Sequence, residues 1–340
     1  MNLNTETLQN LFSELGIKVI SKGVTESPLC TLYHFNIINI RDFDNIEKSV
    51  STIAKFLKQD LTYEESSFAH FAIRLNKIDR QPIMFDCKEF LDLIPKPDDY
   101  DRYNELKIIA GVDSENKPIT FDLNDNPHIL IAGTTGSGKS MMLNNIICDL
   151  LLHKNWLRFT FIDTKKIELS RYKKLNNLWH KVITESNDAL EYLQDICFEI
   201  DYIYEQIEKD ENYEIIPTII VIDELNDLMM ASKKSVEKYI VKIAQMGRAC
   251  GVHLIIATQR PTVDVLTGNI KANIDCRIAL KTASAVDSRV ILDHNGAEKL
   301  IGKGDALLKL PTNDKEIHIQ CPFVDVTKIP KIIEFYNKGD

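Results

Sequence analysis

The stretch Gly133-Thr-Thr-Gly-Ser-Gly-Lys-Ser140 fits the pattern G-x-x-x-x-G-K-[ST]. The apolar run 128–132 leads into it, and a helical pattern over 138–153 leaves it. Glycines let the backbone turn with its N–H groups pointing inward, and the start of a helix adds positive charge. This context predicts a phosphate-binding loop made of Gly133, Thr134, Thr135, Gly136, Ser137, Gly138, Lys139 and Ser140.

A second stretch, Ile219-Ile-Val-Ile-Asp223-Glu224, ends a buried strand with two carboxylates. Ligands of open α/β sheets bind at the carboxyl edge of the strands. We therefore expect Lys139 to reach the β- and γ-phosphates of a nucleoside triphosphate, with Ser140 and Asp223 holding Mg²⁺. Glu224 is expected to orient or deprotonate the attacking water. Alone, such an acidic pair is often a helix N-cap; beside the phosphate loop it favours nucleotide hydrolysis coupled to motion.

A third apolar run, Leu254-Ile-Ile-Ala-Thr-Gln259, also ends in polar residues. Gln259 is a candidate sensor of the γ-phosphate. The other interpretation is that it bonds only to the backbone at the strand end.

Strand-like and helical patterns alternate through the C-terminal two thirds of the chain. This alternation predicts βαβ units and an α/β fold with a mainly parallel sheet flanked by helices. The expected strands are 128–133, 157–163, 218–223, 252–258, 276–282, 304–309 and 316–321, and the expected helices are 138–153, 185–210, 233–250 and 328–337.

The region before residue 105 carries no chemical motif and mixes both element types. We expect strands over 31–39, 69–76 and 81–86 and helices over 44–58 and 86–94. The segment beginning Pro95-Lys-Pro-Asp-Asp is the most plausible boundary, because it combines two prolines with charges. The predicted domains are a small α+β subdomain over 1–105 and a second domain over 106–340.

Composition excludes several classes of protein. The 340 residues include seven scattered cysteines without a Cys-x-x-Cys pair, which favours reduced thiols over disulfides or a zinc site. No apolar run approaches the ~18 residues that span a bilayer, and no signal peptide is readable, so we expect a cytoplasmic location. The net charge of −9 argues mildly against nucleic acid, although a groove can be basic on an acidic body.

Five segments together resemble the FtsK/SpoIIIE family of DNA-translocating ATPases, in the FtsK–HerA branch of RecA-like P-loop motors. They occur in the family's order. The segments are 127–140, 221–230, 247–274, 287–293 and 296–305. The region 17–94 is similar, in order and length, to the smaller α subdomain of the family.

The resemblance implies a hydrolase that assembles as a homo-oligomer, a hexameric ring, around double-stranded DNA. ATP would lie between neighbouring subunits, next to an arginine finger from one of them. The candidates are Arg260, Arg277 and Arg289, of which we favour Arg289. Lys271 and Arg248 are the nearest matches to the residues that contact DNA phosphates.

Further features leave alternatives open. Many relatives have proline where this chain has Thr164, and Lys165 either faces the nucleotide or lies on a solvated turn. Without a membrane segment or a winged-helix module, a mobile-element role with a membrane or mobile-element partner protein is expected. The alternatives are a protein-secretion motor and an ATP-switched interaction module with little turnover.

Overall fold

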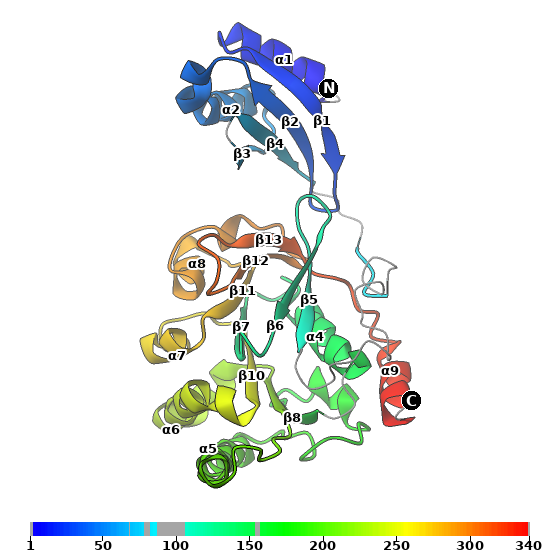
Figure 1. The fold of residues 1–340 in the computed structure, drawn as a ribbon, viewed down its shortest axis with the longest axis vertical. Helices are drawn as coiled ribbons and strands as arrows, with labels where there is room; N and C mark the ends of the chain where they lie inside the picture. Colours follow the sequence, from blue (N-terminus) through cyan, green and yellow to red (C-terminus); the bar gives the residue numbers. More distant parts are fainter. Residues whose placement is uncertain (1–2, 68, 78–81, 87–105, 154–156, 339–340) are drawn as a thin grey trace. The chain divides into compact units, whose positions relative to one another are not determined.

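The computed structural model describes residues 3–67, 69–77, 82–86, 106–153 and 157–338 (Figure 1). They divide into two compact units. Unit 1 comprises Met1–Pro82 and Val112–Lys117, and unit 2 comprises Ile83–Gly111 and Pro118–Asp340. Apart from Asp86, the expected helix 86–94 lies outside the described residues, as does the segment around Pro95. The domain boundary at residue 105 therefore stays a prediction.

Within the described residues, unit 1 is a four-stranded antiparallel sheet in the order β1-β2-β4-β3, with two α-helices and the 3₁₀ helix η1 (Ile40–Asp42). Its core joins Phe12 of one helix to Phe35 and Phe71 of two strands by ring contacts. The strand expected over 69–76 and the helix expected over 44–58 are confirmed. The elements are α1 (Thr5–Glu14), β1 (Val19–Glu26), β2 (Cys30–Ile37), α2 (Phe43–Leu57), β3 (Leu61–Ser67) and β4 (His70–Asn76).

The strand expected over 81–86 is wrong for the residues that the structure describes. Residues 82–86 form only one isolated parallel bridge, between Met84 and Phe323. The Phe85 N–H donates to the Phe323 carbonyl, and the Phe323 N–H donates to the Ile83 carbonyl. This short segment therefore attaches to the chain beyond the last strand and does not extend a sheet.

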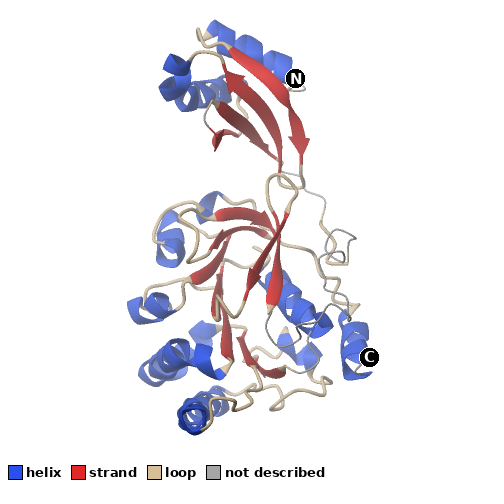
Figure 2. Ribbon diagram, in the orientation of Figure 1, coloured by secondary structure: helices blue, strands red, loops and turns tan. Residues whose placement is uncertain are grey.

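Unit 2 is built on a nine-stranded sheet in the order β6-β5-β13-β12-β11-β7-β10-β9-β8 (Figure 2). Its strands are β5 (Lys107–Val112), β6 (Pro118–Asp122), β7 (His128–Ala132), β8 (Arg158–Ile162), β9 (Thr218–Ile222), β10 (Val252–Thr258), β11 (Cys276–Leu280), β12 (Asp305–Lys309) and β13 (Ile317–Gln320). Its α-helices are α4 (Lys139–His153), α5 (Ser186–Lys209), α6 (Leu225–Met246), α7 (Gly268–Asn273), α8 (Ala285–Leu292) and α9 (Ile329–Lys338), with 3₁₀ turns η2 (Leu169–Tyr172), η3 (Gly247–Cys250) and η4 (Ala297–Lys299).

Five neighbouring strands, from β11 to β8, pair in parallel, whereas β12 and β13 pair antiparallel. The α/β fold class is confirmed. Successive residues of β7 enter different cores: Ile129 and Ile131 pack with α4 and α9, and Leu130 and Ala132 pack with α5 to α8. The sheet is thus buried on both faces, which explains the apolar runs in the sequence.

The parallel register aligns the strand ends. Ala132 of β7 pairs with Thr258 of β10 and Ala279 of β11, and Ile222 of β9 pairs with Ile256 of β10. The loops after these strands therefore meet at one edge of the sheet, here called the carboxyl edge. The opposite edge, where the same strands begin, is the amino edge.

The helix expected over 233–250 is longer than predicted at its start. α6 begins at Leu225, directly after the carboxylate pair, and ends at Met246. Its backbone leaves helical geometry at Ser232, with φ −158° and ψ 78°. Buried Leu225, Leu228 and Met229 hold the first part against the sheet, so tertiary packing extends the helix across this break.

Candidate active site

The phosphate loop joins β7 to α4 and is shaped by its glycines. Gly136 and Gly138 have left-handed φ values of 79° and 110°. A Cβ on Gly138 would lie 2.4 Å from the Gly304 nitrogen, so a larger residue would displace the loop. The Gly304 N–H donates to the Ser137 carbonyl at 2.8 Å. The loop is therefore clamped to the segment before β12.

The donor set of the loop fits an anion. Thr134 is fixed, because its N–H and hydroxyl both donate to the Lys281 carbonyl, at 2.9 and 3.0 Å. In the described part of the chain, the N–H groups of Gly136 and Gly138 donate to no protein acceptor. The first N–H groups of α4 also lack partners within the helix. These groups match what a polyphosphate requires.

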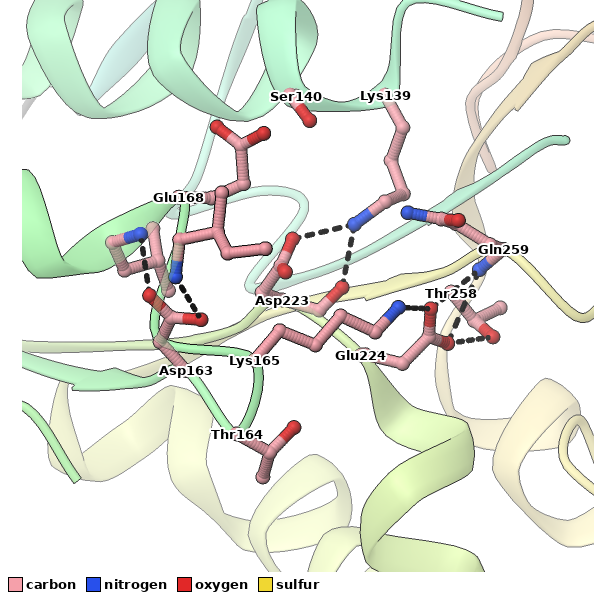
Figure 3. A network of polar contacts seen from close by, with 12 residues as sticks. Lys139, Ser140, Asp163, Thr164, Lys165, Glu168, Asp223, Glu224, Thr258 and Gln259 are labelled. Carbon is pink, nitrogen blue, oxygen red and sulfur yellow. Dashed lines mark hydrogen bonds and ion pairs between the residues drawn. The ribbon is translucent and has the colours of Figure 1, made fainter. Parts of the chain in front are cut away.

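Lys139 and Asp223 form a buried ion pair between the loop and β9 (Figure 3). Lys139 Nζ lies 2.5 Å from Asp223 Oδ1 and 2.6 Å from the Asp223 carbonyl oxygen. Both side chains are 3% exposed. Burial raises the pKa of the Asp223 carboxyl, and the Lys139 ammonium opposes that shift. The sequence prediction that these two residues meet is thus matched by the geometry.

Glu224 is held by the ends of two other strands. Its Oε1 accepts from the Thr258 hydroxyl at 2.7 Å, and both carboxylate oxygens lie 3.2 Å from the Gln259 N–H. Lys165 Nζ donates to Oε2 at 3.0 Å from the opposite side (Figure 3). The Glu224 side chain is only 3% exposed, whereas that of Lys165 is 35% exposed.

The turn after β8 supplies residues that sequence reasoning missed or left open. The Asp163 carboxylate accepts from the N–H groups of Leu169 and Ser170, at 2.9 and 3.0 Å. The Thr164 hydroxyl donates to Asp227 at 2.8 Å. Lys165 points to Glu224, which settles the open question of its direction. A rule that takes every polar residue at or just after the carboxyl end of a parallel strand would have found Thr258 and Asp163.

Ser140 and Asp223 are the residues that fit Mg²⁺. Both present hard oxygen atoms, and Mg²⁺ is usually held by one or two protein groups together with waters and substrate phosphates. No group of three or more His, Cys, Asp or Glu side chains in the described ranges is arranged to hold a metal ion.

The remaining candidates for the nucleotide site are Gln259 and three arginines, which differ in their burial. Gln259 Oε1 accepts from the Thr135 hydroxyl at 3.0 Å, which links the end of β10 to the phosphate loop. Arg289 is exposed on α8 and donates to Asn295 at 2.7 Å. Arg260 is also exposed. Arg277 instead is buried.

The burial of Arg277 gives it a structural role. Its guanidinium donates to the carbonyls of Ile274, Lys271 and Ile291 at 2.6–3.1 Å, and to Asp293 at 2.8 Å. A side chain that is 6% exposed and so fully bonded cannot reach a neighbouring subunit. Its candidacy as an arginine finger is therefore wrong.

The candidate DNA-contacting residues lie at the amino edge. Arg248 in η3 precedes β10, and its side chain is 64% exposed, 3.8 Å from Asp125. Lys271 in α7 precedes β11 and donates to Asp293 at 2.8 Å.

No helix in the described part of the chain is long and apolar enough to span a membrane.

Comparison with known proteins decides the family. The model of the FtsK/SpoIIIE family matches residues 91–215 and 206–263, which together exceed half of the chain. The chain belongs to the FtsK/SpoIIIE family. It is 43% identical over 269 residues to the DNA translocase FtsK of Leptospira interrogans, covering 73% of this chain and 28% of that protein. It is 32% identical over 361 residues to the DNA translocase FtsK of Listeria monocytogenes, covering 98% of this chain and 47% of that protein.

This FtsK/SpoIIIE chain thus spans less than half the length of those two curated relatives. A solved structure, the monomer form of the pCW3 conjugation coupling protein TcpA with ATPγS, matches it almost from end to end. The TM-score is 0.64 at 25% identity, covering 97% of this chain and 99% of that chain. The RecA-like P-loop fold expected from the resemblance is confirmed.

Proposed function

We propose that this chain is an ATP-driven motor that moves double-stranded DNA. The observation that carries the proposal is the carboxyl edge of unit 2. There, a glycine loop with free donors, a buried Lys139–Asp223 pair and the Glu224 carboxylate meet in an FtsK/SpoIIIE chain. TcpA was solved with ATPγS, which supports nucleotide binding by this chain.

The residues divide the chemistry of hydrolysis between them. The loop N–H groups and Lys139 bind the β- and γ-phosphates. Ser140 and Asp223 would hold Mg²⁺, which would neutralise charge on the phosphate oxygens. Glu224 accepts a proton from water. The water oxygen bonds to the γ-phosphorus while the bond from that phosphorus to the β–γ bridging oxygen breaks, so ADP leaves with the bonding electron pair.

The proposed assembly is a hexameric ring in which Arg289 reaches the nucleotide of a neighbour. Exposure of Arg289 on α8 supports this choice over the buried Arg277. Residues 106–340 are proposed as the motor and residues 1–105 as the smaller α subdomain. Arg248 and Lys271 would contact DNA phosphates, which gives binding without sequence selectivity. The likeness to a conjugation coupling protein supports a mobile-element role with a membrane or mobile-element partner protein.

ATP hydrolysis measured with different polymers tests the proposal. We expect Mg²⁺-dependent hydrolysis that linear duplex DNA stimulates at low salt and that single-stranded DNA and peptides stimulate less. Lys139→Ala is the control for a contaminating ATPase. Stimulation by a peptide and not by DNA would favour a secretion motor. ATP binding without hydrolysis under every condition would favour an interaction module.

A further inference from the structure

Three protein donors occupy most of the acceptor capacity of the Glu224 carboxylate. A carboxylate offers about four lone-pair sites. Thr258 uses one on Oε1, the Gln259 N–H bridges both oxygens, and Lys165 uses one on Oε2. A general base must come within about 2.6–3.2 Å of the water whose proton it takes. A water placed along the Oε2 lone pair that Lys165 uses therefore has to displace the Lys165 ammonium.

The three donors differ in their freedom to leave. Thr258 is fully buried within β10, and the Gln259 N–H belongs to the backbone at the end of that strand. The Lys165 side chain is 35% exposed and projects from the turn after β8, an edge strand of the sheet. Thr164 ties this turn to Asp227, so the lysine side chain can move while its backbone stays.

The charges of the site show what would draw Lys165 away. Lys139 with Asp223, and Lys165 with Glu224, are two neutral pairs side by side (Figure 3). A bound nucleoside triphosphate adds several negative charges to this edge, and an ammonium on a four-carbon stem can exchange one anion for another. A terminal phosphate is therefore a competitor for the Lys165 ammonium.

We propose that Lys165 is a latch on Glu224: it occupies Oε2 in the resting site and withholds the base until a terminal phosphate draws its ammonium away. Lys165 is a positioning residue, since it acts through Glu224. The proposal rests on the proposed ATP hydrolysis at this site. It predicts that hydrolysis is slowed by the competition between Glu224 and the terminal phosphate for the Lys165 ammonium.

Steady-state ATP hydrolysis by the full chain without DNA tests the latch with three variants. Lys165→Met removes the ammonium and keeps the length of the side chain. Lys165→Arg keeps a cationic donor. Lys166→Met is the matched control, because the neighbouring lysine makes only an exposed pair with Glu185, at 2.7 Å. Thermal unfolding of each variant confirms that it folds.

We expect Lys165→Met to raise kcat about fivefold, the ratio that corresponds to about 1 kcal/mol for a partly exposed ion pair. Lys165→Arg should keep the low kcat of the wild type, and Lys166→Met should have the same kcat as the wild type. An unchanged or lower kcat in Lys165→Met, or a change confined to KM, would overturn the latch.

The proposed function fails separately from the latch. A wild type that hydrolyses ATP equally with and without duplex DNA contradicts the DNA motor, while the Lys165 variants still decide the latch. If the wild type is inactive but Lys165→Met hydrolyses ATP, the latch is supported. If neither hydrolyses ATP, both proposals are overturned.

Discussion

The charged groups at the carboxyl edge of unit 2 differ in burial and pairing from Arg248 at the amino edge, although Lys271 at that same amino edge is 20% exposed and paired with Asp293. At the carboxyl edge, the side chains of Lys139, Asp223 and Glu224 are each 3% exposed and paired at 2.5–3.0 Å. At the amino edge, Arg248 is 64% exposed and lies 3.8 Å from its nearest carboxylate. Buried charges interact strongly, whereas exposed charges are screened by water and salt.

This difference in burial matches two different functions, hydrolysis of a phosphate bond and contact with the DNA backbone. Chemistry on a phosphate requires groups held in place and shielded from solvent. Non-specific contact with a DNA backbone requires basic groups that are accessible and that release counterions. We therefore expect substitutions at the carboxyl edge to change turnover, and substitutions at the amino edge to change the salt dependence of DNA binding.

The largest expected effect is that of Glu224→Gln at the carboxyl edge. The amide keeps the size of the side chain but cannot take the proton of water. We expect kcat to fall by about 10²–10⁴-fold while ATP still binds, as measured by single-turnover hydrolysis and by binding of a fluorescent ATP analogue. Normal turnover would show that another group is the base.

Next in size is Lys139→Ala, which removes the cation that meets the phosphates. We expect at least about a 10²–10³-fold loss of hydrolysis, together with weaker nucleotide binding measured by titration calorimetry. Arg248→Ala is the matched control from the amino edge and should keep the basal rate. Equal losses in both variants would break the division between the edges.

Arg277 and Arg289 sharpen the distinction between structural and functional arginines. Arg277→Met leaves several buried carbonyl oxygens without a donor. We therefore expect the free energy of unfolding, measured in urea, to fall by about 2–3 kcal/mol. Arg289→Ala should leave the free energy of unfolding within about 0.5 kcal/mol and reduce hydrolysis only where subunits assemble. A stable Arg277→Met protein would contradict the structural role.

At the amino edge the expected effects are smaller. Arg248→Ala or Lys271→Ala should each reduce the slope of log affinity for duplex DNA against log salt by about 0.9 if one phosphate contact is lost. Basal hydrolysis should stay nearly unchanged. Lys55→Ala, an exposed lysine on α2, is the control. An unchanged slope in both variants would move the DNA contacts elsewhere.

The smallest expected effect is the loss, at acid pH, of the stability that the Asp293 carboxylate contributes. Burial alone would raise the pKa of Asp293, but hydrogen bonds and charges from Lys271 and Arg277 outweigh it and lower the pKa to about 2. Its stabilising contribution is therefore complete above its unfolded pKa near ~4 and is lost as pH falls through about 2. The difference in unfolding free energy between wild type and Asp293→Asn should shrink over that interval. A constant difference would exclude the charge as its cause.

The sequence pattern predicted those elements whose residue spacing and hydrophobicity are typical of one kind of structure. The glycine loop and the apolar runs of β7, β9 and β10 follow from spacing and burial on two faces. Strand β1 was missed because its alternation is interrupted: the register shifts between Ser21 and Gly23, and Ile20 is 50% exposed. Strand β5 was missed although four of its residues are apolar, because the run is short and follows the boundary segment.

The contacts within the site depend on tertiary structure. Asp223 was predicted to lie beside Lys139, because strand ends meet at one edge of a parallel sheet. The donors to Glu224, by contrast, come from residues 34 and 59 positions away in the chain. Only the strand order β10-β9-β8 brings Thr258 and Lys165 to opposite sides of one carboxylate.

Displacement of a third strand from a DNA triplex tests the central claim most directly, because it reports movement along duplex DNA itself. We predict that the wild-type chain releases the labelled strand only with ATP and Mg²⁺, and that Lys139→Ala releases none. A chain that hydrolyses ATP and binds duplex DNA but leaves the triplex intact would contradict the account.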